Sequence, residues 1–217
     1  MLGDGCFYEM PRCYQISISF NKLEIDYLNC VLKLFKSVYP KEKFSISELK
    51  NEFLLRTYSR KVSNDFFEMG LKTGRKTKRR IVIPNWIKKD RALVIAFLRG
   101  IFDTDGCLYR KYGSYMQIQM KLANKQLVRD IRAVICRLNF NPTKIIMDFE
   151  KIHKVYEWKF YLSRQAEIHK FIKLIKLRNS KHITRYAKLW GHILTWQNVL
   201  AKKNTCSSGL QKSLLEN

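Results

Sequence analysis

The sequence lacks the features by which membrane and secreted proteins are recognised. No apolar run approaches the ~18–20 residues that span a bilayer, and no signal peptide stands at the N-terminus. The six cysteines include no CxxC pair and the four histidines are scattered, which excludes a zinc site of ordinary ligand spacing. These absences predict no membrane partner and a reducing, intracellular compartment, with an organelle and a prokaryotic cytoplasm both open.

Acidic residues are scarce as well. The chain has 18 Asp and Glu against 42 Lys and Arg, a net charge of +24. A surplus of this size indicates an anionic partner, and without a membrane span a polynucleotide is favoured over an acidic membrane surface. Because 46% of the residues are apolar and 13% aromatic, the chain is not a disordered basic tail. Its 217 residues suit one domain or two small halves that share a core.

The most informative segment is the apolar run at residues 97–106, which ends in Asp103, Thr104, Asp105 and Gly106. A helix C-terminus carries a partial negative charge, so carboxylates there are disfavoured unless a cation lies beside them. This ending therefore predicts a divalent metal site. It is not a calcium-binding loop, because the glycine comes too early and the twelfth position is Ser rather than Glu.

The chain opens with a second copy of this ending, in which Asp4 and Gly5 precede Asp105 and Gly106 by 101 residues. Corresponding patterns follow in both copies: an alternating strand (14–21 and 116–122), an amphipathic helix (23–35 and 127–138) and a hairpin (43–58 and 144–161). Two Asp-Gly endings followed by matching patterns predict an internal duplication.

Local signals place the ends of the helices in both copies. The first helix of each copy should stop at an X-Pro pair, at Tyr39-Pro40 and at Asn141-Pro142. Ser59 and Ser163 should cap a second helix. The predicted fold is α+β, with duplicated αββαββα halves at 1–90 and 91–197 and a loosely ordered tail at 198–217.

The second motif, residues 98–106, resembles the nine-residue signature of the LAGLIDADG homing endonucleases, in the form that fuses two motif-bearing halves in one chain. Residues 83–87 and 179–182 are also similar to family segments, and the resemblance covers about residues 1–190. It implies saddle-shaped antiparallel sheets about a pseudo-twofold axis, where small residues such as Gly100 let two motif helices pack closely. Only the end of the first motif, residues 1–5, is present, so we expect an incomplete partner for the helix face of Leu93, Ala96, Phe97 and Gly100.

The resemblance implies a monomeric, site-specific endonuclease of a mobile intron or free-standing element, which cuts double-stranded DNA at a long site and leaves 3′ overhangs. Asp4 and Asp105 would bind Mg²⁺, which polarises the scissile phosphate and activates a water. Asp103 is a weaker candidate, because Leu2 stands at the matching place. Auxiliary catalytic groups would come from strand ends near the acids, where an ordinary capping or solvated role is the alternative: Asn21, Lys22, Lys121 and Asn124.

The polar faces of the strands would form the DNA-binding surface, since an antiparallel sheet can enter the major groove and read base edges. The candidates on the sheets are Gln15, Ser17, Ser19, Arg56, Arg110, Gln117, Gln119, Lys121 and Lys159. The basic segment between the halves adds phosphate contacts, or else is a solvated linker: Arg75, Lys76, Lys78, Arg79 and Arg80.

Three alternatives on the same scaffold remain open: an intron RNA maturase, a DNA-binding regulator and a decayed endonuclease. The acids at both motif ends favour the nuclease, because a pure binder has no need for them. The incomplete first motif favours the binder or a decayed enzyme.

Overall fold

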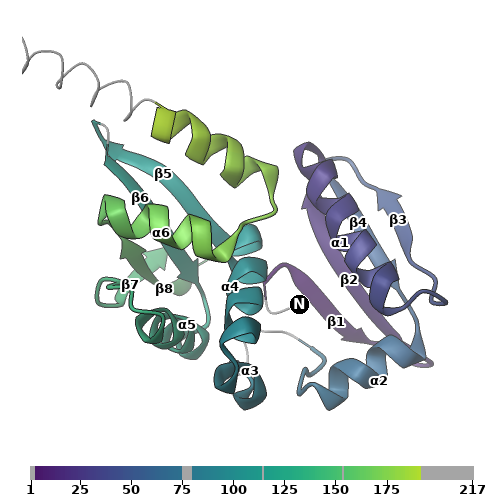
Figure 1. Cartoon of the computed structure of the whole chain (residues 1–217). Coiled ribbons are helices and arrows are strands. Elements are labelled where there is room, and N and C mark those ends of the chain that lie inside the picture. Colours follow the sequence, from purple (N-terminus) through teal and green to yellow (C-terminus); the bar gives the residue numbers. More distant parts are fainter. Residues whose placement is uncertain (1–2, 75–79, 114, 153, 192–217) are drawn as a thin grey trace, which may run out of the picture.

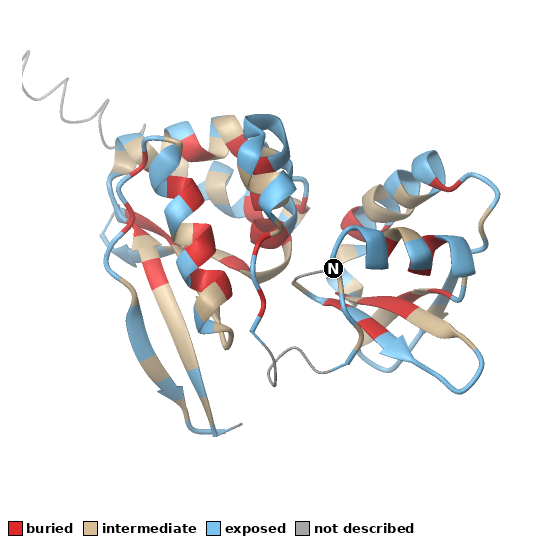
Figure 2. Cartoon of the chain, turned by 90° about the horizontal axis from the view of Figure 1, so that it is seen from below, coloured by how far each residue is buried: buried red, intermediate tan, exposed pale blue. Residues whose placement is uncertain are grey.

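A computed structural model describes residues 3–74 and 80–191, apart from 114 and 153. The chain forms two halves, each with a four-stranded antiparallel sheet and helices on one face (Figures 1 and 2). The strand orders are the same, β1-β2-β4-β3 in the first half and β5-β6-β8-β7 in the second. This equivalence confirms the predicted α+β fold of duplicated halves.

The first half begins with a strand. Its elements are β1 (Gly5–Glu9), β2 (Tyr14–Asn21), the 3-10 helix η1 (Lys22–Glu24), α1 (Ile25–Val38), β3 (Ser45–Glu48), β4 (Glu52–Thr57) and α2 (Arg60–Glu68). Residues 3 and 4 form a bend before β1, so the first motif contributes no helix among the described residues.

The second half carries the motif helix α4 as well as the repeated elements. They are α3 (Asn85–Lys89), α4 (Arg91–Asp105), β5 (Gly106–Tyr112), β6 (Tyr115–Leu122), α5 (Lys125–Arg137), β7 (Ile146–Glu150), β8 (Val155–Leu162), α6 (Gln165–Ile175) and a helix over residues 180–191. Figure 1 shows α4 between the two sheets, with β1 close to it.

Apolar and polar residues alternate along the strands because one face of each sheet is buried, as predicted. In β2 the apolar side chains of Ile16, Ile18 and Phe20 are buried beneath the helices, and Met116, Ile118 and Met120 of β6 occupy the matching positions. The polar residues between them therefore lie on the opposite sheet face. The first strand of each half starts directly after the motif acid, with Gly5 paired to Ile18 and Gly106 to Met120.

The segment before α4 packs on the second half. Ile81 and Ile83 belong to its buried core. The Ile83 backbone N–H donates to Asp130 Oδ2 at 2.9 Å, and Lys88 pairs with the same carboxylate at 2.7 Å. The predicted division between the halves, after residue 90, would separate this segment from the core on which it packs. We therefore propose a boundary before Ile81.

Two predicted helix ends are wrong. Helix α5 stops at Arg137 rather than at Asn141-Pro142, because Asn139 takes a left-handed conformation with φ 65°. Ser163 does not cap α6, whose N-cap is Arg164; instead the Ser163 hydroxyl accepts a hydrogen bond from Gln117. By contrast, the end of α1 at Tyr39 and the Ser59 cap of α2 are confirmed.

In the described part of the chain, no helix combines the length and apolar character that crossing a membrane requires. The five described cysteines are free thiols.

Candidate functional site

The two motif ends meet at the junction of the halves. Asp105 is the last residue of α4, and Asp4 precedes β1. A Cβ added at Gly3 would lie 2.2 Å from Thr104 Oγ1 and 2.3 Å from Asp105 Oδ2. Distances below 3.0 Å are not tolerated, so only glycine fits here without a shift of its neighbours. The sequence repeat thus corresponds to a contact in space, with the first motif directly against the second acid.

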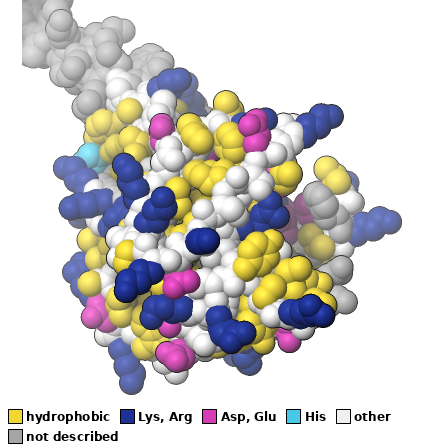
Figure 3. All heavy atoms as spheres, turned by 90° about the vertical axis from the view of Figure 1, so that its right-hand side faces the viewer, with side chains coloured by type: hydrophobic (Ala, Val, Ile, Leu, Met, Phe, Trp, Pro, Cys, Tyr) yellow, Lys and Arg dark blue, Asp and Glu magenta, His cyan; other side chains and the backbone are white. Residues whose placement is uncertain are grey.

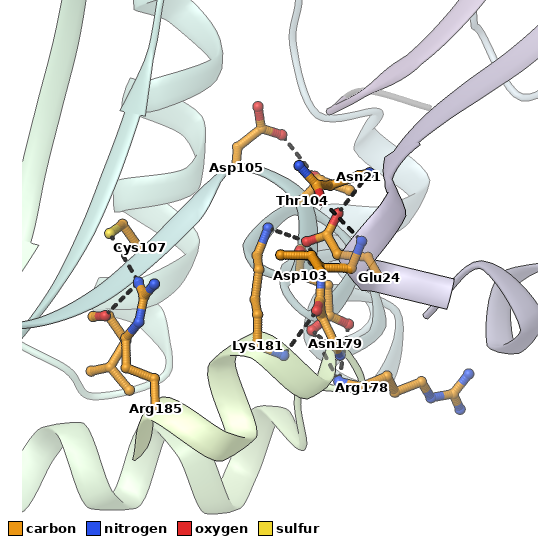
Figure 4. Close-up of polar contacts among 12 residues, drawn as sticks. Asn21, Glu24, Asp103, Thr104, Asp105, Cys107, Arg178, Asn179, Lys181 and Arg185 are labelled. Atoms are coloured by element: carbon orange, nitrogen blue, oxygen red, sulfur yellow. Dashed lines mark hydrogen bonds and ion pairs between the residues drawn. The ribbon is translucent and has the colours of Figure 1, made fainter. Parts of the chain in front are cut away.

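Asp105 is held at the end of its helix. The Thr104 hydroxyl, which also contacts the carbonyl oxygens of Gly100 and Ile101, donates to Asp105 Oδ2 at 2.7 Å. Figure 4 shows the Asp105 carboxylate beside Thr104 at the junction. Asp4 is exposed and Asp105 half-buried. Both carboxylates can therefore reach a ligand that approaches the junction from solvent.

Asp103, the other acid of the motif, has a structural role. Its side chain is 1% exposed and accepts hydrogen bonds from the backbone N–H groups of Arg178 at 2.9 Å and Asn179 at 3.0 Å. Burial raises the pKa of Asp103, while these N–H donors act in the opposite direction. The carboxylate thus anchors the segment that leads into the helix over residues 180–191, which leaves Asp105 as the accessible acid of this motif.

A polar cluster joins the halves beside these acids. Glu24 of the first half accepts from Asn179 Nδ2 at 2.9 Å and pairs with Lys181 Nζ at 2.7 Å (Figure 4). Asn179 also donates to the carbonyl oxygen of Asp103 at 3.0 Å. Burial would raise the pKa of Glu24, but the hydrogen bonds from Lys181 and Asn179 hold it below its ordinary value. We call Glu24, Asp103, Asn179 and Lys181 the bridging cluster.

His182 follows Lys181 of the bridging cluster in the sequence and is 2% exposed. Burial, with Lys181 nearby, lowers the pKa of His182 to about 4, although a hydrogen bond to the Asp103 backbone acts against this shift. Its Nε2 atom is buried without a hydrogen-bond partner. The ring is therefore neutral at pH 7 and packs as part of the interior.

Two of the predicted auxiliary residues are helix caps. Asn21 accepts from the Leu23 N–H at 2.9 Å and caps η1, and Asn124 accepts from the Leu127 N–H at 3.2 Å and caps α5. Asn21 nevertheless lies near an acid, because it lines with Asp4 a concave surface of about 580 Å³. Asn124 also accepts from the Ile81 N–H at 3.4 Å, which gives it a part in packing the segment before α3.

The two auxiliary lysines are ion-paired within their own halves. Lys22 Nζ lies 2.5 Å from Glu48, and Lys121 Nζ lies 2.5 Å from Glu157. Each lysine would have to leave its carboxylate to contact a substrate phosphate.

Most predicted DNA-binding residues of the first sheet share its outer face. Gln15, Ser17 and Ser19 alternate with the buried side of β2, and Arg56 of β4 lies opposite Ser17. Arg56 donates to the Ser47 hydroxyl on β3. Ser17 is only 8% exposed, so its hydroxyl lies deeper than its neighbours.

The second sheet presents Gln119, Lys121 and Lys159 on the equivalent face, where Lys121 and Lys159 are register partners. Lys159 pairs with Asp148 at 2.6 Å, and this contact raises the pKa of Lys159.

Two predicted DNA-binding residues of this sheet, Gln117 and Arg110, are not available as free groups on its outer face. Gln117 is 4% exposed, and its amide accepts from the Tyr109 hydroxyl at 2.7 Å and donates to Ser163 at 2.6 Å. Arg110 follows Leu108 by two residues and pairs with Met116, which places it on the helix-covered face. Within the basic segment, Arg80 is exposed, and Arg75, Lys76, Lys78 and Arg79 lie outside the described residues.

The charge surplus is visible on the surface. Figure 3 shows Lys and Arg side chains spread over the side of the molecule formed by the first half, with Asp and Glu interspersed. This distribution fits a large polyanion better than a small anion bound in one pocket.

The acids at the junction suit a hard divalent cation. Mg²⁺ is commonly held by one or two carboxylates while phosphate oxygens and waters complete its shell. Among the described residues, no group of three or more His, Cys, Asp or Glu gathers as a complete metal site. Asp4 and Asp105 could each supply a carboxylate to a cation whose other ligands are phosphate oxygens and waters.

The sequence did not predict Glu24 as a residue of the site, and it marked residues 179–182 only as similar to a family segment. The Asn21–Glu24 spacing is that of a capping box, which the structure shows, and could have marked the start of a helix. That Glu24 also reaches the other half depends on tertiary packing and has no local sequence signal.

The comparisons with known proteins agree with this architecture. The LAGLIDADG-like domain family matches residues 92–191. The fold is similar to that of the homing endonuclease I-DmoI, with 20% identity, a TM-score of 0.57 and coverage of 80% of this chain and 89% of that one. The meganuclease I-SmaMI shows 13% identity and a TM-score of 0.56, with 97% and 91% coverage. The N-terminal LAGLIDADG domain of WhiA shows 18% identity and a TM-score of 0.52, with 82% and 80% coverage.

The family match covers the second half, and the first half repeats its sheet topology. Residues 92–191 match the LAGLIDADG-like domain family, and the chain as a whole has a two-halved fold similar to that of the homing endonucleases I-DmoI and I-SmaMI.

Proposed function

We propose that this chain is a site-specific endonuclease that cuts both strands of DNA in a metal-dependent reaction. The observation that carries the proposal is the contact of Gly3 with Thr104 and Asp105, which brings the two motif ends together. Two carboxylates at the junction of two sheet-bearing halves match a duplex, whose two strands need one cut each.

DNA as the substrate is supported by charge and by the relatives. The net charge is +24, and on the face that Figure 3 shows the Lys and Arg side chains are spread out rather than gathered in one place. I-DmoI has been crystallised with DNA and Mn and with DNA and Ca, and I-SmaMI bound to uncleavable DNA. These complexes support double-stranded DNA and a divalent cation for this chain, and we propose Mg²⁺. We also propose that the protein acts as a monomer and is the endonuclease of a mobile intron or of a free-standing element.

The roles of the residues follow from their positions. Asp4 and Asp105 would bind divalent cations, each of which would act on one scissile phosphate, and Thr104 orients Asp105 through its hydroxyl. A bound Mg²⁺ would supply Lewis acidity and lower the pKa of a water. Asn21, on the surface shared with Asp4, would position that water or the phosphate. We propose 3′ overhangs, as in the family that the motif indicates.

Base reading would come from the outer faces of the two sheets. Gln15 and Ser19 in the first half and Gln119 in the second offer amide and hydroxyl groups, which read base edges. Arg56 and Lys159 lie on the same faces and suit guanine or phosphate contacts. Gln117 and Arg110 are left out of this proposed surface because of their burial and orientation.

A binder without nuclease activity, such as a DNA-binding regulator, is the second candidate. The ion pairs of Lys22 and Lys121 favour it, since both lysines are engaged within the protein.

The two candidates are separated by one experiment. Duplexes that bind the protein are first selected from a random pool in Ca²⁺, then cloned into a plasmid and incubated with Mg²⁺. The nuclease proposal expects linear plasmid with Mg²⁺ and none with EDTA. Specific binding without any cut in Mg²⁺ or Mn²⁺ would replace it with the regulator.

A further inference from the structure

The helix over residues 180–191 forms one wall of a basic cleft. The cleft has a volume of about 620 Å³ and is lined by Asn21, Leu23, Glu24, Ser180, Lys181, Thr184, Arg185 and Lys188. Lys181, Arg185 and Lys188 follow each other at spacings of four and three residues, so they lie along one face of the helix. They span about 10 Å of the helix axis, at ~1.5 Å per residue.

The electrostatics of this cleft favour an anion. Its single acid, Glu24, is already neutralised by Lys181 at 2.7 Å and receives a further hydrogen bond from Asn179. Arg185 and Lys188 have exposed side chains, and no acid other than Glu24 lines the cleft. Ser180 and Thr184 add hydroxyl groups on the same wall, and hydroxyl groups commonly contact phosphates.

The Arg185 side chain is held in one orientation by contacts with β5. Its Nη1 donates to the Leu108 carbonyl oxygen at 3.0 Å and lies 3.8 Å from Cys107 Sγ (Figure 4). This tether to β5 fixes the guanidinium at the wall of the cleft. A preoriented guanidinium loses less conformational freedom on binding a phosphate than a mobile lysine does.

The cleft continues into the surface that holds Asp4. Asn21 and Glu24 line both the basic cleft and the concave surface of about 580 Å³ that includes Asp4. A strand bound at Asp4 would therefore meet the basic cleft next.

We infer that this cleft binds the phosphodiester backbone of the DNA strand that passes Asp4, at phosphates beside the cut. The inference rests on the proposed function, and it assigns a second anchoring site outside the two sheets. Arg185 and Lys188 neutralise the phosphates, and Lys181 links this anchor to Glu24 and thus to the junction. The anchor carries no base specificity, because only backbone groups are contacted.

The test compares two double variants that remove equal charge. R185Q/K188Q removes the two cleft cations that are not paired with Glu24, and K170Q/K173Q removes two exposed lysines of α6 that do not line the cleft. DNA affinity is measured from 50 to 200 mM salt on a selected site. We expect the cleft variant to bind at least ~10-fold more weakly and to lose about 1.8 from the salt slope, ~0.9 per phosphate contact, and the α6 variant to change the slope by less than about 0.3. The single variant K188Q, which leaves the Arg185 tether intact, should lose about half as much.

Ethylation interference locates the contact. Ethylating a phosphate beside the cut on the Asp4 strand should weaken binding of the wild type but not of R185Q/K188Q. Equal losses in both double variants would reduce the effect to net charge and overturn the inference while the endonuclease proposal stands. If the wild type bound no DNA at all, both the function and the cleft would be refuted.

Discussion

Gly3 is the residue at which the two copies of the motif touch. Its missing side chain leaves room for Thr104 and Asp105, so the position of the second acid depends on a glycine in the first copy. In this site, the position of the Asp105 carboxylate depends on steric fit as well as on charge. Small displacements of reacting groups are costly, since about 1 Å can cost ~10²-fold in rate.

Replacing Gly3 tests this dependence. Gly3→Ala should lower DNA cleavage at least ~10-fold while affinity stays within about threefold, because the new Cβ pushes Asp105 aside. Gly100→Ala is the matched control, since a Cβ there meets no atom within 4 Å. Plasmid cleavage and equilibrium binding are measured for both. Cleavage at the wild-type rate by Gly3→Ala would show that the contact does not position the acid.

His182 predicts acid sensitivity. Its pKa is lowered to about 4 in the folded chain, against an ordinary value near 6.5. As the pH falls from 6.5 to 4, the unfolded chain binds a proton that the folded chain does not, so the free energy of unfolding should fall by up to about 3 kcal/mol. This contribution is fully present above pH 6.5.

Urea unfolding of the wild type and His182→Gln between pH 7 and 4 measures the effect. The difference between the two proteins isolates this residue from Glu24 and Asp130, whose pKa values are lowered and which titrate in both proteins. Parallel pH profiles would contradict a neutral, buried His182.

At the scale of elements, the halves are joined by α4, by η1 and by the helix over residues 180–191. Asp103 at the end of α4 anchors that last helix by accepting a hydrogen bond from the Asn179 N–H. The Asn179 side chain in turn donates a hydrogen bond to Glu24 of η1. The last helix is also packed on α6, where the His169 and Trp190 rings stack at 4.6 Å. The groove on the other side of α4 is apolar, with a volume of about 340 Å³, and its α4 wall includes the exposed Ala96 and Gly100.

A double-mutant cycle tests the connection between η1 and the last helix. Asn179→Ala should cost about 2 kcal/mol of unfolding free energy, because it removes one hydrogen-bond donor from Glu24 and one from the Asp103 carbonyl oxygen. Combined with Glu24→Gln, the coupling energy should be about 1 kcal/mol.

The control cycle is Arg164 with Glu167, an ion pair within one half at 3.4 Å whose Arg164 side chain is exposed, for which we expect less than about 0.5 kcal/mol. Additive effects at Glu24 and Asn179 would mean that the hydrogen bond across the halves does not stabilise the fold.

Most of the element order could be predicted, because the alternation in β2 and β6 and the Asp-Gly repeats are local signals. The ends of α5 and α6 could not: the left-handed Asn139 replaces the expected X-Pro stop, and Ser163 bonds to Gln117 instead of to a helix N–H. For the site, the two acids are local signals as well. The bridging role of Glu24 joins residues 155 positions apart, which no pattern in the chain encodes.

At the scale of the whole molecule, charge is the dominant property. A surplus of +24 predicts that DNA binding depends steeply on salt. If about six phosphates are contacted, affinity should fall roughly 10³-fold between 50 and 200 mM salt, because each contact releases counterions. Titrations of a labelled duplex at four salt concentrations measure the slope. A slope near zero would exclude a polynucleotide as the ligand.

The claim that the two motif acids carry out the cuts is tested most directly by removing each in turn. Asp4→Asn and Asp105→Asn are assayed on a plasmid with a selected site in Mg²⁺, beside Asp26→Asn, which removes the same charge from an exposed position on α1. We predict that both motif variants lose double-strand cleavage while their DNA affinity stays within about threefold of the wild type, and that Asp26→Asn cuts normally. Wild-type linearisation by either motif variant would contradict the account.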